Sequence, residues 1–152
     1  MNDMTGAPAG CIALPPGGGR EYDMGGMRAV FKADEDETQQ RFSVSEWWLE
    51  PHTEGPGGHS HDQNDEIFYV LSGTATMRLG DVWLDAPAGS FFMIPARTVH
   101  DFANRSDARV GLLNVFIPGG FERNMPAIVT WFRENRQPAM RSHEEQRELN
   151  GS

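Results

Sequence analysis

Short apolar runs separated by turn-forming residues fill the middle of the chain. Turns recur about every ten residues between β-branched and aromatic segments, a pattern typical of an all-β sandwich or barrel. An internal repeat of the solenoid kind is not found in the sequence. We expect strands at the following places: 27–33, 41–50, 66–73, the two sides of a Gly80-Asp81 turn, 91–95, 98–104 and 108–118.

The two ends of the chain differ in composition and hydrophobic pattern from the β-rich middle. Residues 1–25 are rich in Gly, Pro and Ala and form an expected N-terminal arm, in which Cys11 to Leu14 is a candidate edge strand. The β domain covers 26–120. Helical spacing of Ile128, Trp131 and Phe132 predicts a C-terminal helix over 121–137, with Asn124 as its cap and Pro138 after its end. Residues 138–152 form a charged tail that we expect to be disordered.

Composition narrows the possible partners. The 152 residues suit one domain, and the formal net charge is −9. Nucleic acid and anionic membranes bind clustered Lys and Arg, so neither is expected here, and a small-molecule ligand or a cation suits this charge better. The single cysteine allows no internal disulfide and no thiolate cluster. Without a recognisable leader or a long apolar span, the expected compartment is the cytoplasm.

One short segment concentrates metal-ligating residue types. His59 and His61 are two apart, so on a strand both imidazoles would share a face. Glu66 follows five residues after His61, and strict alternation would place it on the other face. The intervening Asp62 to Asp65 are turn formers, so a turn or bulge can reset the phase and bring the carboxylate to the same side.

A second segment carries another histidine. His100 follows the turn after Pro95, and if this hairpin faces the first segment it adds a third imidazole. Three imidazole nitrogens and one carboxylate suit a divalent transition metal such as Fe, Mn, Ni, Cu, Co or Zn. Four protein ligands leave two positions on a six-coordinate ion for water, dioxygen or a chelating substrate.

Two motifs in these segments resemble those of the cupin superfamily, including quercetin-cleaving dioxygenases. The first is His59-x-His61-x4-Glu66-x6-Gly73, and the second runs Gly89-x5-Pro95-x-Arg97-x2-His100-x3-Asn104. The resemblance covers roughly residues 40–118. It implies a double-stranded β-helix, or jelly-roll barrel, with the C-terminal helix outside it, His59, His61, Glu66 and His100 as metal ligands, and a homodimer.

The sequence departs from the family pattern at two positions. Thr53 stands where the first motif commonly has glycine, and Arg97 stands at a common glycine of the second. Arg97 could bind an anionic group of a substrate, or it could be a solvent-exposed turn residue.

Alternation also suggests residues that line a cavity near the metal. Counting by twos from Glu66 and His100 places Phe68 and Phe102 on the same faces, and Phe92 could join them across the hairpin. Asn114 interrupts an apolar run, and Trp48 could face the same space. Each aromatic could equally be ordinary core, and together they predict an apolar cavity that binds substrate.

The function expected from this pattern is a metal-dependent enzyme on a small organic molecule, of dioxygenase type. Glu66 would be a ligand or a general base, and Arg97 would orient an anionic group. The ligand set also fits a non-redox isomerase, lyase or cyclase, or a protein that binds a metabolite through the metal without turnover. His52 and His143 lie outside the motifs and are expected at the surface.

Overall fold

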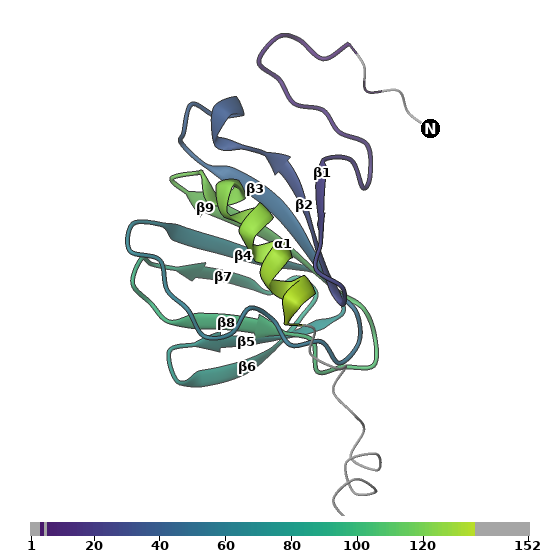
Figure 1. The fold of residues 1–152 in the computed structure, drawn as a ribbon, viewed down its shortest axis with the longest axis vertical. Helices are drawn as coiled ribbons and strands as arrows, with labels where there is room; N and C mark the ends of the chain where they lie inside the picture. Colours follow the sequence, from purple (N-terminus) through teal and green to yellow (C-terminus); the bar gives the residue numbers. More distant parts are fainter. Residues whose placement is uncertain (1–3, 5, 136–152) are drawn as a thin grey trace, which may run out of the picture.

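Two antiparallel sheets make up most of the molecule (Figure 1). The computed structural model describes residue 4 and residues 6–135. Within this part of the chain the strands are β1 Arg20–Asp23, β2 Met27–Ala33, β3 Ser43–Leu49, β4 Asp65–Ser72, β5 Thr74–Leu79, β6 Val82–Pro87, β7 Phe91–Ile94, β8 His100–Ala103 and β9 Val110–Ile117. Three helical segments accompany them: η1 Glu35–Glu37, η2 Phe121–Asn124 and α1 Met125–Glu134.

The larger sheet has the strand order β1-β2-β3-β9-β4-β7, and the smaller has the order β6-β5-β8. This arrangement confirms the expected all-β jelly roll with a C-terminal helix. The backbone pairing divides into two sheets, however, so the expected barrel is a two-sheet sandwich. Two isolated bridges, Thr53↔Asn104 and His59↔His100, join the loop between β3 and β4 to the smaller sheet and its flank.

A glycine marks the point where the chain crosses from one sheet to the other. β4 of the large sheet ends at Ser72, and β5 of the small sheet begins at Thr74. Gly73 between them has φ +73°, a conformation that side chains disfavour. A Cβ there would also lie 2.5 Å from the carbonyl oxygen of Arg109. Both the backbone conformation and the lack of space therefore require glycine at the strand end that the sequence predicted.

Alternation along β3 decides which aromatic faces the interior. Ser43, Ser45, Trp47 and Leu49 are buried, whereas the residues between them are half-buried. Trp47 therefore packs in the core between the sheets, edge-on to Phe31 and Phe102. Trp48, expected to line the cavity, is on the opposite face, with its ring against Gly111 of β9 and under the Arg109 guanidinium. The expectation for Trp48 was wrong because the phase of β3 favours its neighbour.

The N-terminal segment contains a strand that the pattern did not predict. Cys11 to Leu14 form no strand and are exposed. Instead β1 pairs antiparallel with β2, and Tyr22 packs edge-on against Phe31. The segment expected as an arm thus does supply the edge strand of the large sheet, but through Arg20–Asp23 rather than through Cys11 to Leu14.

The C-terminal helix follows a short 3-10 turn and packs against the core with one narrow face. Ile128, Val129 and Phe132 contact the core, whereas Trp131 is 50% exposed, so it does not belong to the packed face as expected. Asn124 makes no side-chain cap and has helical backbone angles because η2 leads directly into α1. The helix ends at Glu134, while Pro138, His143 and the charged tail lie outside the described residues. None of the described helices has the length and apolar character needed to cross a bilayer.

Candidate metal centre

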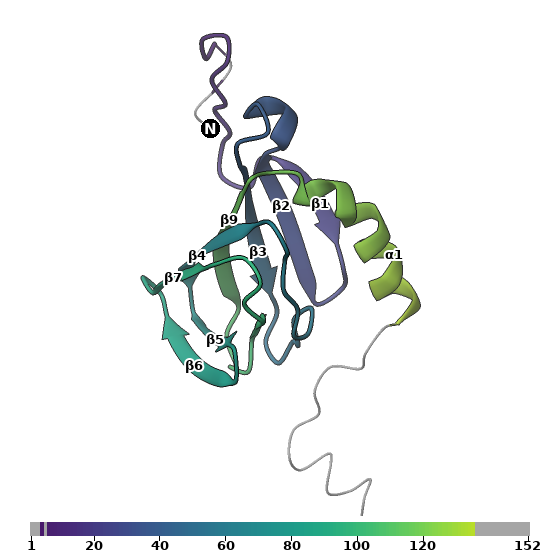
Figure 2. The same cartoon turned by 90° about the vertical axis from the view of Figure 1, so that its left-hand side faces the viewer.

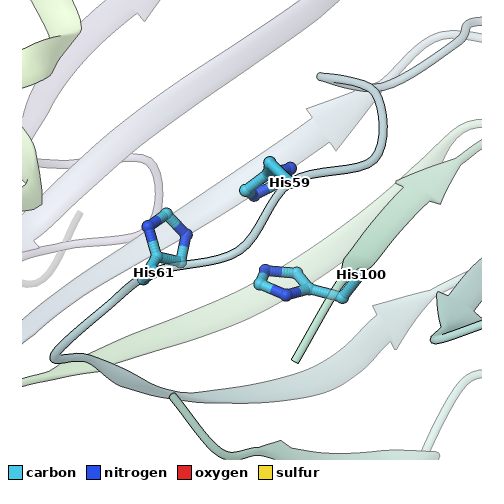
Figure 3. Close-up of side chains that lie close together, drawn as sticks. All are labelled: His59, His61 and His100. Atoms are coloured by element: carbon cyan, nitrogen blue, oxygen red, sulfur yellow. The ribbon is translucent and has the colours of Figure 1, made fainter. Parts of the chain in front are cut away.

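Three histidines converge from two separate segments (Figure 3). His59 and His61 lie on the loop before β4, and His100 begins β8. The His59 amide donates to the carbonyl of His100 at 3.1 Å, and the His100 amide donates to the carbonyl of His59 at 2.8 Å. This small antiparallel bridge holds the loop in an extended form. The imidazoles of His59 and His61 therefore point to the same side of the loop, although the loop is not part of a sheet strand.

Three of the four expected ligand residues form a cluster, and the fourth, Glu66, contacts two of them. One ring nitrogen from each of His59, His61 and His100 lies within 4.8 Å of the others. Glu66 points inward from β4 and is 2% exposed. Its Oε1 is 3.5 Å from Nε2 of His61, and its Oε2 contacts Nε2 of His100. A bend at residues 62–63 resets the phase between His61 and Glu66, so that Glu66 reaches the side of the histidines as the sequence predicted.

Backbone carbonyls orient two of the imidazoles. Nδ1 of His59 lies 2.7 Å from the Gly57 carbonyl oxygen, and Nδ1 of His100 lies 2.8 Å from that of Thr98. A carbonyl only accepts, so each Nδ1 carries the hydrogen and each Nε2 keeps its lone pair. Metal-binding histidines in proteins are commonly fixed in this way.

Burial and the neighbouring acid act in opposite directions on the imidazoles. Burial lowers the pKa of His61, with the nearby histidines assisting and Glu66 opposing. For His100, burial also lowers the pKa, but the contact with Glu66, its negative charge and the Thr98 carbonyl outweigh burial and raise it. The carboxylate thus favours positive charge close to the position where the nitrogens meet.

The donor atoms fit a divalent metal ion. Nε2 of His61, Nε2 of His100 and Oε2 of Glu66 are buried and make no well-directed hydrogen bond among the described residues. Buried polar atoms normally have hydrogen-bond partners. These three atoms lie close together without such partners, which fits a shared metal ion. Three neutral nitrogens and a carboxylate satisfy the preferences of borderline transition metals.

The cavity beside the histidines is small and largely apolar. It has a volume of about 40 Å³, which is room for about one water molecule. The polar residues of its wall are His59, Glu66 and Asn114. The apolar residues of its wall are Met27, Trp47, Pro56, Phe68, Phe102, Phe116, Phe121, Ile128 and Phe132.

The structure places the expected lining residues in different positions. Phe68, Phe102 and Asn114 border the cavity as predicted, and Asn114 donates to the Ile67 carbonyl at 3.3 Å. Phe92 is outside the wall and packs half-buried against the core. Trp48 lines a groove on the outer face beneath the N-terminal segment.

Several wall residues were missed by sequence reasoning. Trp47 was missed because Ser43 and Ser45, which share its face of β3, give that face no apolar pattern. Phe116 is two positions from Asn114 and therefore shares its face of β9. Phe121 stacks on Phe116 at 4.4 Å between ring centroids and meets His61 edge-on at 5.7 Å. Its position depends on the fold of the chain after Gly120, which no local pattern reveals.

Arg97 lies at a turn beside the site rather than in the cavity wall. Its φ is +68°, and its amide donates to the His61 carbonyl at 2.7 Å. The side chain is exposed. These observations support the turn-residue interpretation, because a positive φ accounts for glycine being common at this position of the motif.

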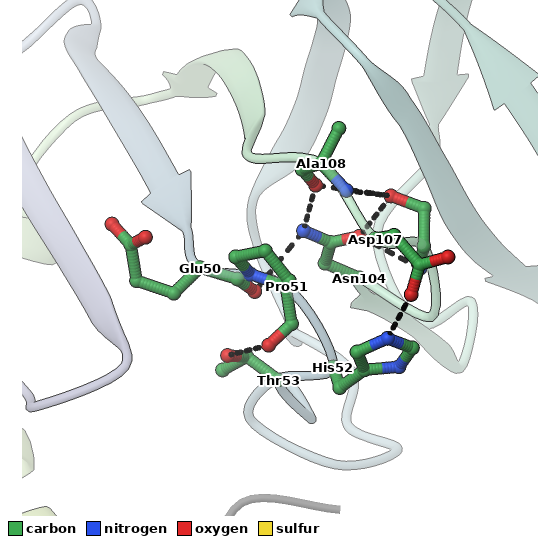
Figure 4. A network of polar contacts seen from close by, with 8 residues as sticks. Glu50, Pro51, His52, Thr53, Asn104, Asp107 and Ala108 are labelled. Carbon is green, nitrogen blue, oxygen red and sulfur yellow. Dashed lines mark hydrogen bonds and ion pairs between the residues drawn. The ribbon is translucent and has the colours of Figure 1, made fainter. Parts of the chain in front are cut away.

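The last residue of the second motif stabilises the neighbouring loops (Figure 4). Asn104 is fully buried, and its Nδ2 donates to the carbonyls of Leu49, Glu50 and Ala108 at 3.1, 3.0 and 2.7 Å. Its Oδ1 accepts from the amide and hydroxyl of Ser106. His52 lies nearby at the surface, paired at 2.5 Å with exposed Asp107, as expected for a loop residue outside the site.

Comparison with known sequences agrees with this geometry. The profile of the cupin domain family Cupin_2 matches residues 45–116, a segment that contains all four clustered residues. Residues 45–116 of this chain are a cupin domain. Quercetin 2,3-dioxygenase of Bacillus subtilis (strain 168) is 30% identical over 130 residues, which is 80% of this cupin but only 36% of that protein.

Solved structures of other cupins share the fold. An RmlC-like cupin from Shewanella frigidimarina NCIMB 400 superposes with a TM-score of 0.62 and 18% identity, covering 74% of this chain and 94% of that one. KdgF from Halomonas sp. gives a TM-score of 0.60 at 18% identity, covering 68% and 90%. At these identities the similarity supports the fold and not the activity of this cupin. The histidine cluster and the family together suggest a divalent metal.

Proposed function

We propose that this cupin is a metal-dependent dioxygenase that inserts both atoms of dioxygen into a small, largely apolar organic substrate. The observation that carries the proposal is the meeting of three imidazoles and the buried Glu66 at the wall of an otherwise apolar cavity. The similarity to quercetin 2,3-dioxygenase supports the reaction class. The ion would be Fe, Mn, Ni, Cu, Co or Zn, of which the redox-active members suit dioxygen chemistry.

The chain's own residues would divide the work at the site. His59, His61, His100 and Glu66 would hold the ion, which when bound supplies Lewis acidity and open positions for substrate and dioxygen. The carbonyls of Gly57 and Thr98 keep two imidazoles in the tautomer that binds metal. When its carboxylate is not bound to the ion, Glu66 would take a proton from an acidic hydroxyl of the substrate, because it is buried at the cavity wall.

The wall chemistry limits the substrate. Its aromatic and aliphatic side chains exclude water and favour a flat unsaturated molecule, and Asn114 is the neutral polar group that could orient it. The wall contains no Lys or Arg in the described part of the chain, so an anionic group has no paired charge there. The volume of about 40 Å³ is well below the ~150 Å³ that holds one benzene ring. A substrate of that size requires the wall formed by Phe121, Ile128 and Phe132 to move.

One observation favours a second candidate on the same site. Oε2 of Glu66 is buried and has no well-directed hydrogen bond to the described residues, so this carboxylate suits proton transfer in a non-redox isomerase, lyase or cyclase. Both reactions need the same ion, and binding without turnover would need only the ion and the cavity. The three therefore differ in oxygen consumption and product, not in metal content.

The test begins with metal content. Protein purified without chelator is expected to contain about one equivalent of a transition metal by elemental analysis. His59→Ala and His100→Ala should each lose most of it while the fold, followed by circular dichroism, is retained. His52→Ala is the matched control, since His52 is paired with Asp107 away from the cluster and should leave the metal unchanged. Full metal content in the two cluster variants would contradict the ligand assignment.

The second stage separates the reaction classes. Candidate substrates such as flavonols, catechols and keto acids are mixed with metal-loaded protein under anaerobic conditions, and oxygen is then added. Oxygen uptake in proportion to product supports the dioxygenase. Product formed before oxygen is added supports the isomerase, lyase or cyclase, and tight binding without product supports the binding protein.

A further inference from the structure

Two polar and two aromatic side chains alternate on the inner faces of β4 and β9. In the register of these strands Glu66 lies opposite Phe116, and Phe68 lies opposite Asn114. All four side chains are buried and border the cavity beside the histidines. Glu66 and Asn114 are therefore diagonal neighbours, and such positions lie about 7–8 Å apart. Glu66 belongs to the candidate metal centre, which leaves the role of Asn114 to be explained.

The side-chain amide of Asn114 has a defined orientation. Its Nδ2 donates to the Ile67 carbonyl at 3.3 Å. A carbonyl oxygen only accepts, so the nitrogen must be the end of the amide that faces Ile67. Oδ1 is on the other branch of the amide, buried and without a hydrogen-bond partner among the described residues. Asn114 is 1% exposed, so bulk water does not reach this oxygen.

The residues on the adjacent strands do not supply the missing donor. Ser45 lies opposite Asn114 on β3, and its hydroxyl accepts from the Trp47 indole at 2.9 Å but makes no hydrogen bond to Oδ1. Phe68, on the β4 side, has no polar side-chain group. A buried acceptor without a donor is costly, and native proteins leave few of them. The cavity has room for about one water molecule, which would satisfy Oδ1 until a ligand replaces it.

We infer that Oδ1 of Asn114 accepts a hydrogen bond from a hydroxyl or N–H group of the substrate, at the end remote from the metal. The inference rests on the function proposed above, which places the other end of the substrate at the ion beside Glu66. The substrate class is then a flat, neutral molecule with a metal-binding oxygen at one end and a hydrogen-bond donor about one aromatic ring away. Phe68 and Phe116 flank the apolar part between these two ends.

Both polar residues keep their positions when the cavity opens. They project from β4 and β9, which are paired with each other in the large sheet. The part of the wall that moves for a larger substrate comes from η2 and α1, and α1 lies beside β1 (Figure 2). Strands hold side chains more precisely than loops do. The sheet therefore sets the distance between the two ends of the substrate.

The experiment compares two catechols that differ in one group. One carries a hydroxymethyl group para to a catechol oxygen, and the other carries an ethyl group at the same place. Both can bind the metal through the catechol oxygens, and they have equal numbers of non-hydrogen atoms, but only the first has a donor at its far end. Dissociation constants are measured by isothermal titration calorimetry on metal-loaded protein without oxygen. The hydroxymethyl compound should bind about 10–100-fold more tightly, because the ethyl compound leaves Oδ1 without a donor.

Asn114→Leu tests the residue itself, because leucine has a similar shape and no acceptor. It should bring the two dissociation constants within about 3-fold of each other while the metal content stays the same. Without ligand, its urea midpoint should be equal to that of the wild type or higher, because a buried unpaired oxygen has been removed. Asn135→Leu is the matched control. Nδ2 of Asn135 also donates to a backbone carbonyl, that of Trp131, but this residue is exposed at the end of α1.

A preference for the hydroxymethyl compound that is lost in Asn114→Leu and kept in Asn135→Leu supports the inference. Equal affinity of the two compounds for the wild type overturns it and leaves the proposed function standing, since both compounds then still bind at the metal. Binding of neither compound overturns it together with the proposed substrate class. A preference that persists in Asn114→Leu with a lowered urea midpoint also overturns it, because the amide then serves the fold. The comparison in the wild type needs no variant, so it decides the matter even if Asn114→Leu does not fold.

Discussion

Asp101 connects the protein interior to the orientation of His59 in the candidate metal centre, and its removal should weaken metal binding although none of the four proposed ligands is changed. The side chain is 5% exposed. Its Oδ1 accepts hydrogen bonds from the amides of Gly57 at 3.1 Å and Phe102 at 2.8 Å. The Gly57 carbonyl in turn accepts from Nδ1 of His59 at 2.7 Å. Asp101→Ala would release the loop end that fixes the His59 ring.

The size of the effect follows from these contacts. Two hydrogen bonds to a carboxylate would each contribute about 1.5–3 kcal/mol, but burial raises the pKa of Asp101, which shows that the charged form pays a desolvation cost. We therefore expect a loss of about 1–3 kcal/mol in the free energy of unfolding, or about 3–9 °C in Tm for a chain of this length. Loss of a residue that orients a ligand typically lowers metal affinity ~10–100-fold.

Metal affinity is measured by competition with a chromophoric chelator, and stability by urea unfolding of the metal-free protein. Asp101→Asn is the matched control, because its Oδ1 can still accept from the two amides. It should keep affinity within a few-fold of wild type. Affinity in Asp101→Ala equal to that of the wild type would refute the orienting role. Equal weakening in both variants would show that the charge, and not the hydrogen bonds, acts on the site.

Three further substitutions test other parts of the structure. Arg97→Gly should raise the free energy of unfolding, measured in urea, by about 1 kcal/mol, because glycine adopts φ +68° without strain. A loss of substrate affinity in this variant would instead show that the Arg97 side chain binds substrate. Asn104→Ala should lower the free energy of unfolding by about 2–4 kcal/mol by removing a buried amide that donates to the carbonyls of three residues, and a change below ~0.5 kcal/mol would contradict this. Phe132→Ala should enlarge the cavity and tighten binding of bulkier aromatic ligands in fluorescence titrations while metal content stays constant. An unchanged ligand size limit would show that α1 does not bound the cavity entrance.

Local pattern was sufficient for most of the strands. In the segments that become β2, β4 and β9, alternation and turn residues predict the elements and their ends to within a few residues, because a strand between two sheets must place every second side chain inside. The pattern failed where packing between distant segments decides. β1 was missed because its pairing with β2, rather than its own composition, makes it a strand. Trp48 was exchanged for Trp47 because an aromatic pair does not reveal the phase of its strand.

The candidate site divides in a similar way. The motif spacing identified His59, His61, Glu66 and His100, since ligand chemistry restricts the residue types and the bend at 62–63 restricts their phase. The orienting contacts of Asp101 could not be predicted, because they join residues 44 positions apart. The cavity volume depends on where η2 and α1 fold back, and the sequence up to Gly120 does not contain that information.

The sequence by itself therefore determined the class of fold and the residues that form the candidate centre, because periodicity and side-chain chemistry are local properties. Only the tertiary structure decided which aromatics surround the histidines and which backbone groups hold their rings. Those features arise when two sheets and a helix close around one core, and their positions are set by contacts between residues that are far apart in the chain.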